Sequence, residues 1–142
     1  MSHSYGAKSY KQVAVTTASR GQILIMLYES AIKNLKRAVE CIEKRDISGK
    51  GMAIGKAHDI VNELTNTLDF EVGGDIAIRL EQLYQFIASQ LVKANLESNV
   101  EPLRNSKKIL ENLLDGWRGA VAQVERSAAT PLQPVKNPTE GK

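Results

Sequence analysis

The side chains able to do catalytic or metal chemistry are few in this chain and poorly placed for it. The only histidines are His3, near the N-terminus, and His58, whose neighbours on a predicted helix are polar. A di-iron centre in a helical bundle needs Glu-x-x-His pairs from two helices, and haem ligation needs inward-facing ligands on facing helices. The sequence offers neither pattern, and His58 with Asp59 is better explained as a solvated helix surface. We therefore expect no metal and no cofactor.

Cys41 and the glycine pair Gly73-Gly74 do not indicate an active site either. Glu40 and Glu43 stand close to Cys41 in the sequence, and nearby carboxylates raise the pKa of a thiol, which makes it less reactive. A single cysteine cannot form an internal disulfide, which agrees with a reducing compartment. The glycine pair lacks the preceding strand and the spacing of a nucleotide-binding loop, so we interpret it as a turn between helices. The residues predict a protein that is not an enzyme.

Length and composition fit one soluble domain. The 142 residues, 42% hydrophobic and 25% charged, suffice for one packed core. Lys and Arg are mixed with Asp and Glu and form no basic stripe, so the net charge of +3 does not predict nucleic-acid binding. No apolar run reaches the ~18 to 20 residues of a membrane span, and the first residues lack the apolar core of a secretory signal. We expect a cytoplasmic protein with no membrane insertion.

Apolar residues at helical spacing predict four helices. They span about 19–45, 52–68, 75–94 and 102–126. Ser19 and Asp75 are suitable N-cap residues, and Pro102 suits a first helical turn, where its missing N–H costs nothing. The predicted connection at 46–51 contains two glycines that end the first helix. Connections of about five to seven residues favour antiparallel neighbours, so we expect an all-α fold, an antiparallel up-down-up-down four-helix bundle.

The two ends of the chain lack this periodicity. Residues 1–18 are mostly small and polar around Tyr5 and Tyr10, which predicts a flexible N-terminal arm. Residues 127–142 contain three prolines and few apolar residues, which predicts a disordered C-terminal tail. The expected organisation is therefore an arm at 1–18, a four-helix bundle domain at 19–126 and a tail at 127–142.

The first predicted helix is apolar over more of its circumference than a core-facing helix needs. One face carries apolar residues from Leu24 to Ile42, and Ile25, Ile32 and Val39 extend that face at seven-residue intervals. The apolar arc then covers roughly half of the helix, against ~100° for an ordinary surface helix. Either this helix is central in its bundle, or the additional residues form a groove for a helical partner.

Short sequence elements in a fixed order, from Tyr10 to Trp117, carry a resemblance to a known family. They are Tyr10-Lys11-Gln12 with Val13 to Val15, Thr17-Ala18-Ser19, Leu24 to Glu29, Lys56-Ala57 with Ile60 and Glu63-Leu64, Gly73-Gly74, Leu83-Tyr84, Ala94-Asn95 and Trp117. No element is specific alone, but together they resemble the flagellar secretion chaperones, which bind flagellin in the bacterial cytosol before export. The chain departs from the family pattern at Arg20, where proline is common, and at Gly116, where alanine is common.

The resemblance implies an export chaperone. In this family the C-terminal segment of flagellin wraps around the bundle in apolar grooves, which prevents premature polymerisation and keeps the segment competent for flagellar type III secretion. Flagellin is then the expected partner, with components of the export apparatus as further candidates. The alternative is a helical-bundle adaptor that binds another flagellar regulator or export component through the same surface.

The resemblance also points to the arm. The family's N-terminal tyrosine segment packs over part of the groove when no client is bound, and Tyr10 with Val13 and Val15 matches that segment. With the additional apolar residues of the first helix, the expected partner-binding residues are Tyr10, Val13, Val15, Ile25, Ile32 and Val39.

Overall fold

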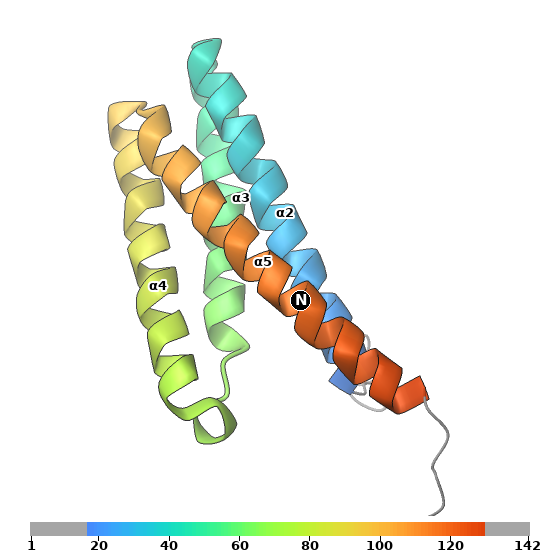
Figure 1. Ribbon diagram of the computed structural model, residues 1–142. Coiled ribbons are helices and arrows are strands. Elements are labelled where there is room, and N and C mark those ends of the chain that lie inside the picture. Colours follow the sequence, from blue (N-terminus) through green and yellow to red (C-terminus); the bar gives the residue numbers. More distant parts are fainter. Residues whose placement is uncertain (1–16, 130–142) are drawn as a thin grey trace, which may run out of the picture.

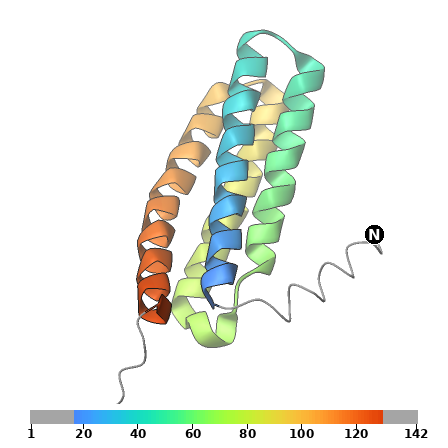
Figure 2. The same cartoon turned by 90° about the vertical axis from the view of Figure 1, so that its right-hand side faces the viewer.

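The computed structural model describes residues 17–129, with side chains from 20 to 127, and that range holds four helices. They are α2 (Thr17–Glu43), α3 (Ile47–Asn66), α4 (Phe70–Glu97) and α5 (Val100–Ala129). Successive helices run in opposite directions; α2 packs between α3 and α5, and α4 packs on the other side of those two helices (Figure 1, Figure 2). The predicted all-α, up-down-up-down four-helix bundle is confirmed for the described residues. The division into arm, bundle and tail stays a prediction.

The core is built from one apolar stripe of each helix. Large side chains that are at most 1% exposed come from all four helices: Tyr28, Leu35, Val61, Leu64, Tyr84, Ile87, Leu91, Leu103 and Leu110. Within each helix these residues recur three, four or seven positions apart, which places them on one face. Because a large apolar side chain contributes about 1.5–3 kcal/mol when it is removed from water, this repeat is what holds the four helices together.

The connection between α2 and α3 is shorter than predicted. The expected connection at 46–51 is wrong, because α3 begins at Ile47 and Asp46 is its N-cap. The Asp46 carboxylate accepts a hydrogen bond from the backbone N–H of Gly49, with the nitrogen 2.9 Å from Oδ1. Gly49 lies inside this first turn. A larger residue would not fit there, because its Cβ would lie 2.7 Å from the Cys41 sulfur. The glycine therefore permits close packing of α3 on the end of α2 and does not break a helix.

The third predicted helix begins earlier than expected and is kinked where it was expected to start. Asp69, not Asp75, is the N-cap of α4, and its carboxylate accepts two backbone N–H bonds from the first turn, each at 3.0 Å. Gly74 has φ 51° and ψ −125°, the one non-helical backbone conformation inside this helix. A backbone with positive φ favours glycine, because glycine has no Cβ to clash with the neighbouring backbone. The predicted break at the glycine pair is therefore present, but it follows a turn formed by residues 70–73.

A buried lysine fixes the opposite end of the bundle. Lys50 of α3 is 8% exposed, and its Nζ donates to the backbone oxygen of Asn95, at 2.9 Å, and to Oγ of Ser98, at 2.8 Å. A positive charge is favourable at the C-terminus of α4, where backbone carbonyls lack helical partners. Pro102 then lies in the first turn of α5, as predicted. These contacts tie α3 to α4 and keep this end of the bundle closed.

Candidate functional site

An apolar pocket of about 550 Å³ opens at the end of the bundle away from Lys50, where α4 and α5 diverge (Figure 1). Three helices, α2, α4 and α5, and the connection between α3 and α4 contribute to it. The lining residues are Arg20, Gly21, Ile23 and Leu24 of α2; Thr67, Leu68 and Asp69 at the connection from α3 to α4; Val72, Gly73, Ile76, Ala77, Leu80 and Tyr84 of α4; and Trp117, Ala120, Val121 and Val124 of α5. The volume is within the ~300–1,000 Å³ of typical ligand pockets and can hold several side chains of a partner.

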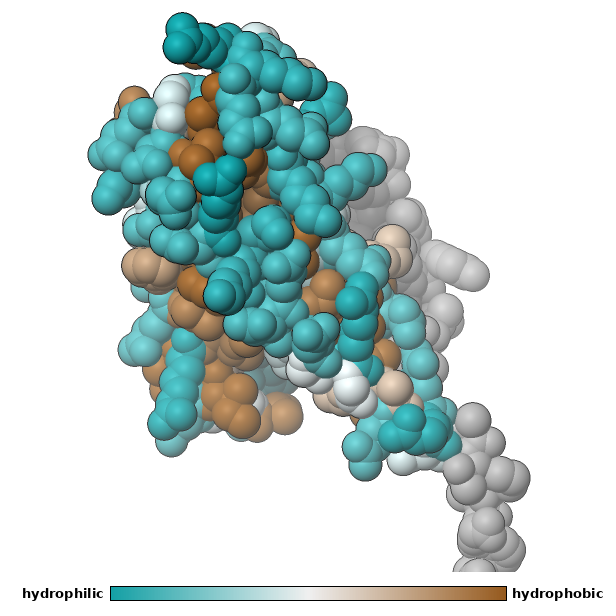
Figure 3. All heavy atoms as spheres, turned by 45° about the horizontal axis from the view of Figure 1, so that its top comes forward, coloured by the Kyte–Doolittle hydropathy of each residue, from teal (hydrophilic) through white to brown (hydrophobic). Residues whose placement is uncertain are grey.

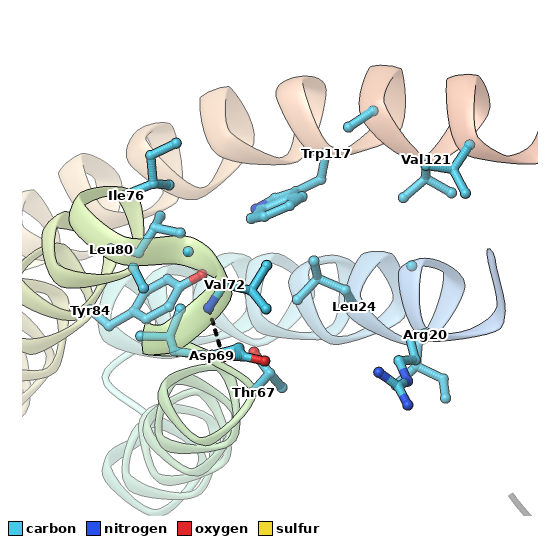
Figure 4. A pocket seen from close by; sticks show the side chains of 17 residues that line it. Arg20, Leu24, Thr67, Asp69, Val72, Ile76, Leu80, Tyr84, Trp117 and Val121 are labelled. Carbon is cyan, nitrogen blue, oxygen red and sulfur yellow. Dashed lines mark hydrogen bonds between the residues drawn. The ribbon is translucent and has the colours of Figure 1, made fainter. Parts of the chain in front are cut away.

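The α4 wall of the pocket carries the most exposed apolar side chains. Val72 is 85% exposed and Ile76 is 66% exposed, although both are large hydrophobic residues. In Figure 4 the α4 side chains lie across the pocket from Trp117 and Val121 of α5. Figure 3 shows apolar surface gathered at the lower left, over the first part of α4. Contiguous exposed apolar surface of this kind is typical of a protein-binding site.

The α2–α5 side of the pocket is tightly closed. A Cβ placed on Gly21 would lie 2.6 Å from a methyl carbon of Val121, so the two helices approach as closely as they do only because residue 21 is glycine. One residue further, Nε2 of Gln22 donates to Oε2 of Glu125 at 2.5 Å. These contacts fix α2 and α5 against each other at this end of the bundle.

Two aromatic side chains, Tyr84 and Trp117, line the inner end of the pocket, and the fully buried Tyr28 is hydrogen-bonded to both. Nε1 of Trp117 donates to the Tyr28 hydroxyl at 3.2 Å, and that hydroxyl is 2.5 Å from the hydroxyl of Tyr84. The two tyrosine rings are in a T-shaped arrangement with centroids 6.4 Å apart. Burial raises the pKa of Tyr28, and for Tyr84 burial and the neighbouring Tyr28 raise the pKa further. Both hydroxyls therefore stay neutral, and the inner end of the pocket is uncharged and held in place by hydrogen bonds.

Comparison with known proteins agrees with the sequence elements found above. The sequence profile of the family described as "Flagellar protein FliS" matches residues 1–124. The chain belongs to the FliS family. The flagellar secretion chaperone FliS of Salmonella typhimurium is 36% identical over 118 residues, which cover 80% of this chain and 87% of that protein. FliS of Vibrio cholerae is 34% identical over 114 residues, which cover 78% and 84%.

A solved structure supports the fold. It is described as "Crystal structure of flagellar chaperone from bacteria" and matches with a TM-score of 0.71 at 22% identity, covering 85% of this chain and 98% of that one. At that identity the likeness concerns the fold alone.

Membership of the FliS family confirms the resemblance and the predicted chaperone role in flagellar export. FliS proteins are chaperones, so the prediction that this chain is not an enzyme is confirmed as well. A secretion chaperone acts on another protein, which makes a protein of flagellar export its partner.

Within residues 17–129, no three His, Cys, Asp or Glu side chains are grouped so that they could hold a metal ion. None of the helices in that range is long and apolar enough to cross a membrane.

Of the six partner-binding residues predicted from the sequence, the structure places the three on α2. Ile32 is 7% exposed, and Ile25 and Val39 are partly buried and packed against the core. None of the three lines the pocket. Their position agrees with the alternative in which this helix is central in the bundle, between α3 and α5. Contact of these three residues with a FliS client stays a prediction.

The other three, Tyr10, Val13 and Val15, lie outside the described residues. Their contact with the groove or the client also stays a prediction.

Sequence reasoning missed the residues that line the pocket. Helical spacing within the predicted helices 75–94 and 102–126 places Ile76 and Val121 on inner faces, and Val72 lies outside the predicted helices. Helical periodicity shows which residues face inward, but it does not show where neighbouring helices diverge and leave an inward face uncovered. The sequence carries one sign of irregular structure there: the glycine pair lies between Val72 and Ile76, and the helix is kinked at Gly74.

Proposed function

We propose that this FliS-family chaperone binds the C-terminal segment of flagellin with the apolar pocket between α4 and α5. Binding there keeps the segment from polymerising in the cytoplasm and holds it in a form that the flagellar type III secretion system can export. The observation that carries the proposal is the open apolar pocket, with Val72 and Ile76 exposed on its α4 wall and an uncharged inner end. Family membership supports the client class.

The pocket is suited to an amphipathic helix. A helix presents apolar side chains at positions i, i+3, i+4 and i+7, and a groove between two diverging helices accepts that row. Each large apolar side chain that enters contributes about 1.5–3 kcal/mol. Three or four such side chains contribute about 5–12 kcal/mol together, which is of the same order as the cost of association and of ordering the segment. We therefore expect a reversible complex that can release the client at the export machinery.

A titration tests the proposal directly. The full chain is titrated by calorimetry with the C-terminal segment of flagellin from the same organism, and helicity is followed by circular dichroism. We expect a one-to-one complex, a negative heat-capacity change and more helix than the sum of the parts, because apolar burial and coupled folding give those signatures. Absence of binding at high micromolar concentration would overturn the client assignment and favour the adaptor for another flagellar regulator or export component.

The N-terminal arm has a proposed role at the same pocket. The first helix begins at Thr17, and Arg20, Gly21 and Leu24 line the pocket, so the arm joins the bundle at the edge of the pocket. An arm that occupies the pocket lowers the apparent affinity for the client by the fraction of time for which it is docked.

We therefore expect Tyr10→Ala to tighten binding in the same titration by about twofold to tenfold, with helicity unchanged. An unchanged dissociation constant would remove the arm from the mechanism. Weaker binding would show that Tyr10 contacts the client and does not compete with it.

A further inference from the structure

Polar side chains are few around the apolar pocket, and most of them already have partners within the protein. The lining side chains that carry a polar atom are Arg20, Thr67, Asp69, Tyr84 and Trp117. The Tyr84 hydroxyl and the Trp117 N–H are both hydrogen-bonded to the hydroxyl of Tyr28. Oγ1 of Thr67 donates to the backbone oxygen of Leu64 at 2.7 Å. These groups have little left to offer a partner.

The two charged side chains of the pocket differ in the same respect. The Asp69 carboxylate caps α4, where its Oδ1 accepts the backbone N–H groups of Glu71 and Val72, each at 3.0 Å. Arg20 is exposed, and its guanidinium takes part in none of the four ion pairs found among the described residues. Arginine carries several N–H donors and no acceptor. Arg20 therefore presents unused donors and a positive charge beside an apolar surface.

Arg20 lies at the outer end of the pocket, near the end of the bundle. In Figure 4 it is at one end of the pocket and Tyr84 is at the other. Along α2, Arg20 precedes Tyr28 by eight residues, which corresponds to about 12 Å of helix. Leu24 of α2 and Val121 of α5 line the pocket between these ends. The pocket is thus apolar along its length and carries a positive charge at its outer end.

The position of Arg20 does not stabilise the free helix. Arg20 is in the first turn of α2, where a positive charge opposes the helix dipole, and this turn has no acidic residue to offset it. By contrast, Arg104 and Arg118 form ion pairs with Glu43 and Glu29. A role in recognition explains a cation at this place better than a role in folding does.

We propose that Arg20 determines specificity by binding an acidic side chain of the client, an Asp or Glu on the helix face that enters the pocket. The inference rests on the proposed function, because it concerns the same pocket. A guanidinium can donate two parallel hydrogen bonds to one carboxylate. The pocket then selects a segment whose apolar row ends in a carboxylate, and it disfavours a segment with Lys or Arg there.

The length of the pocket sets the spacing expected in the client. In a helix, residues seven positions apart share a face and lie about 10.5 Å from each other. If an apolar side chain of the client contacts Trp117, a residue seven positions away on the client reaches the level of Arg20. An acidic side chain at that position is the partner that we assign. The carboxylate at the end of the client chain could reach Arg20 only if the client ended there.

Calorimetric titration of the full chain with the flagellin C-terminal segment tests the role of Arg20. In about 50 mM salt, Arg20→Gln should weaken binding about threefold to tenfold, because it removes the charge and keeps a side chain of intermediate length. The difference from the wild type should disappear in about 1 M salt, where charges are screened over about 3 Å. Arg37→Gln is the matched control. It removes the same charge from an exposed position of α2 outside the pocket, and it should bind within about twofold of the wild type.

Variants of the segment identify the carboxylate. Each Asp and Glu of the segment is changed in turn to Asn or Gln, and the segment is also prepared with an amidated C-terminus. One of the side-chain variants should lose about the same factor as Arg20→Gln does when it is titrated into the wild type. The same variant should lose nothing further when it is titrated into Arg20→Gln, because the two groups act as one pair.

Four results would overturn the proposal. If the wild type binds the segment and Arg20→Gln binds it equally well, Arg20 has no part in recognition and the proposed function stands. Equal losses in Arg20→Gln and Arg37→Gln would reduce the effect to net charge. Coupling of Arg20 to the amidated C-terminus alone would assign the contact to the end of the client chain. A wild type that does not bind the segment would overturn the proposed function together with this inference.

Discussion

Replacing Ile76 by aspartate is expected to weaken binding of the flagellin C-terminal segment on the order of a hundredfold. Ile76 lines the pocket from the α4 side and is 66% exposed in the free protein, so the carboxylate is hydrated before binding. A bound segment covers that position, and desolvating a charge without a partner costs several kcal/mol. The free bundle should tolerate the change, because an exposed side chain contributes little to the core. Calorimetric titration gives the dissociation constant, and circular dichroism with urea unfolding shows that the helices and their stability are retained.

Met26→Asp is the matched control for this experiment. Met26 is 63% exposed, close to the value for Ile76, and it lies on α2 outside the pocket. The control should bind the segment within about twofold of the wild type, as expected for a surface substitution away from the contact. Equal losses for both variants would mean that the client covers a broad surface and that the pocket has no special part in binding. If Ile76→Asp bound the segment as tightly as the wild type does, the client would bind outside the pocket.

The bundle could be predicted from the sequence because its core repeats are regular. Spacing alone places Leu64, Ile87 and Leu110 on the inner faces of their predicted helices, and each is fully buried. The connections were less predictable, because one residue can carry two different signals. Gly49 was interpreted as a helix breaker, whereas Asp46, three residues earlier, is an N-cap that accepts the Gly49 N–H. The capping carboxylate starts the helix, and glycine is needed in its first turn because a Cβ there would lie 2.7 Å from the Cys41 sulfur.

The proposed binding site was less accessible to sequence reasoning than the fold. The additional apolar residues of the first helix invited the interpretation of a partner surface, yet Ile32 is buried where α2 packs between its neighbours. The pocket depends on how far α4 and α5 diverge, and that depends on interactions between distant segments, such as the close approach of Gly21 to Val121. Helical periodicity has no information on such approaches. The chain's chaperone class came from the order of many short elements and not from any single site.

Raising the pH above 10 is expected to destabilise the protein by about 1–3 kcal/mol at pH 11 through Tyr28 and Tyr84. Burial raises the pKa of both phenols in the folded state above the value of about 10 that they have when unfolded. The folded protein therefore retains two protons that the unfolded chain releases. For a group whose folded pKa is raised, the stabilisation is fully present below the unfolded pKa and is lost as the pH rises toward the folded pKa. Urea unfolding at half-unit steps from pH 8 to 11.5 measures the slope.

The double variant Tyr28→Phe with Tyr84→Phe isolates the contribution of the two phenols from every other effect of high pH on the protein. It should be less stable than the wild type at pH 8, because the Trp117 N–H loses its acceptor and a partly buried donor without a partner costs about 1–3 kcal/mol. Its stability should nevertheless fall less steeply above pH 10, so the two curves converge as the pH rises. Parallel curves would show that the phenols ionise in the folded state, and hence that the inner end of the pocket admits water. The comparison therefore reports on the closure of the same aromatic cluster on which the bound client would rest.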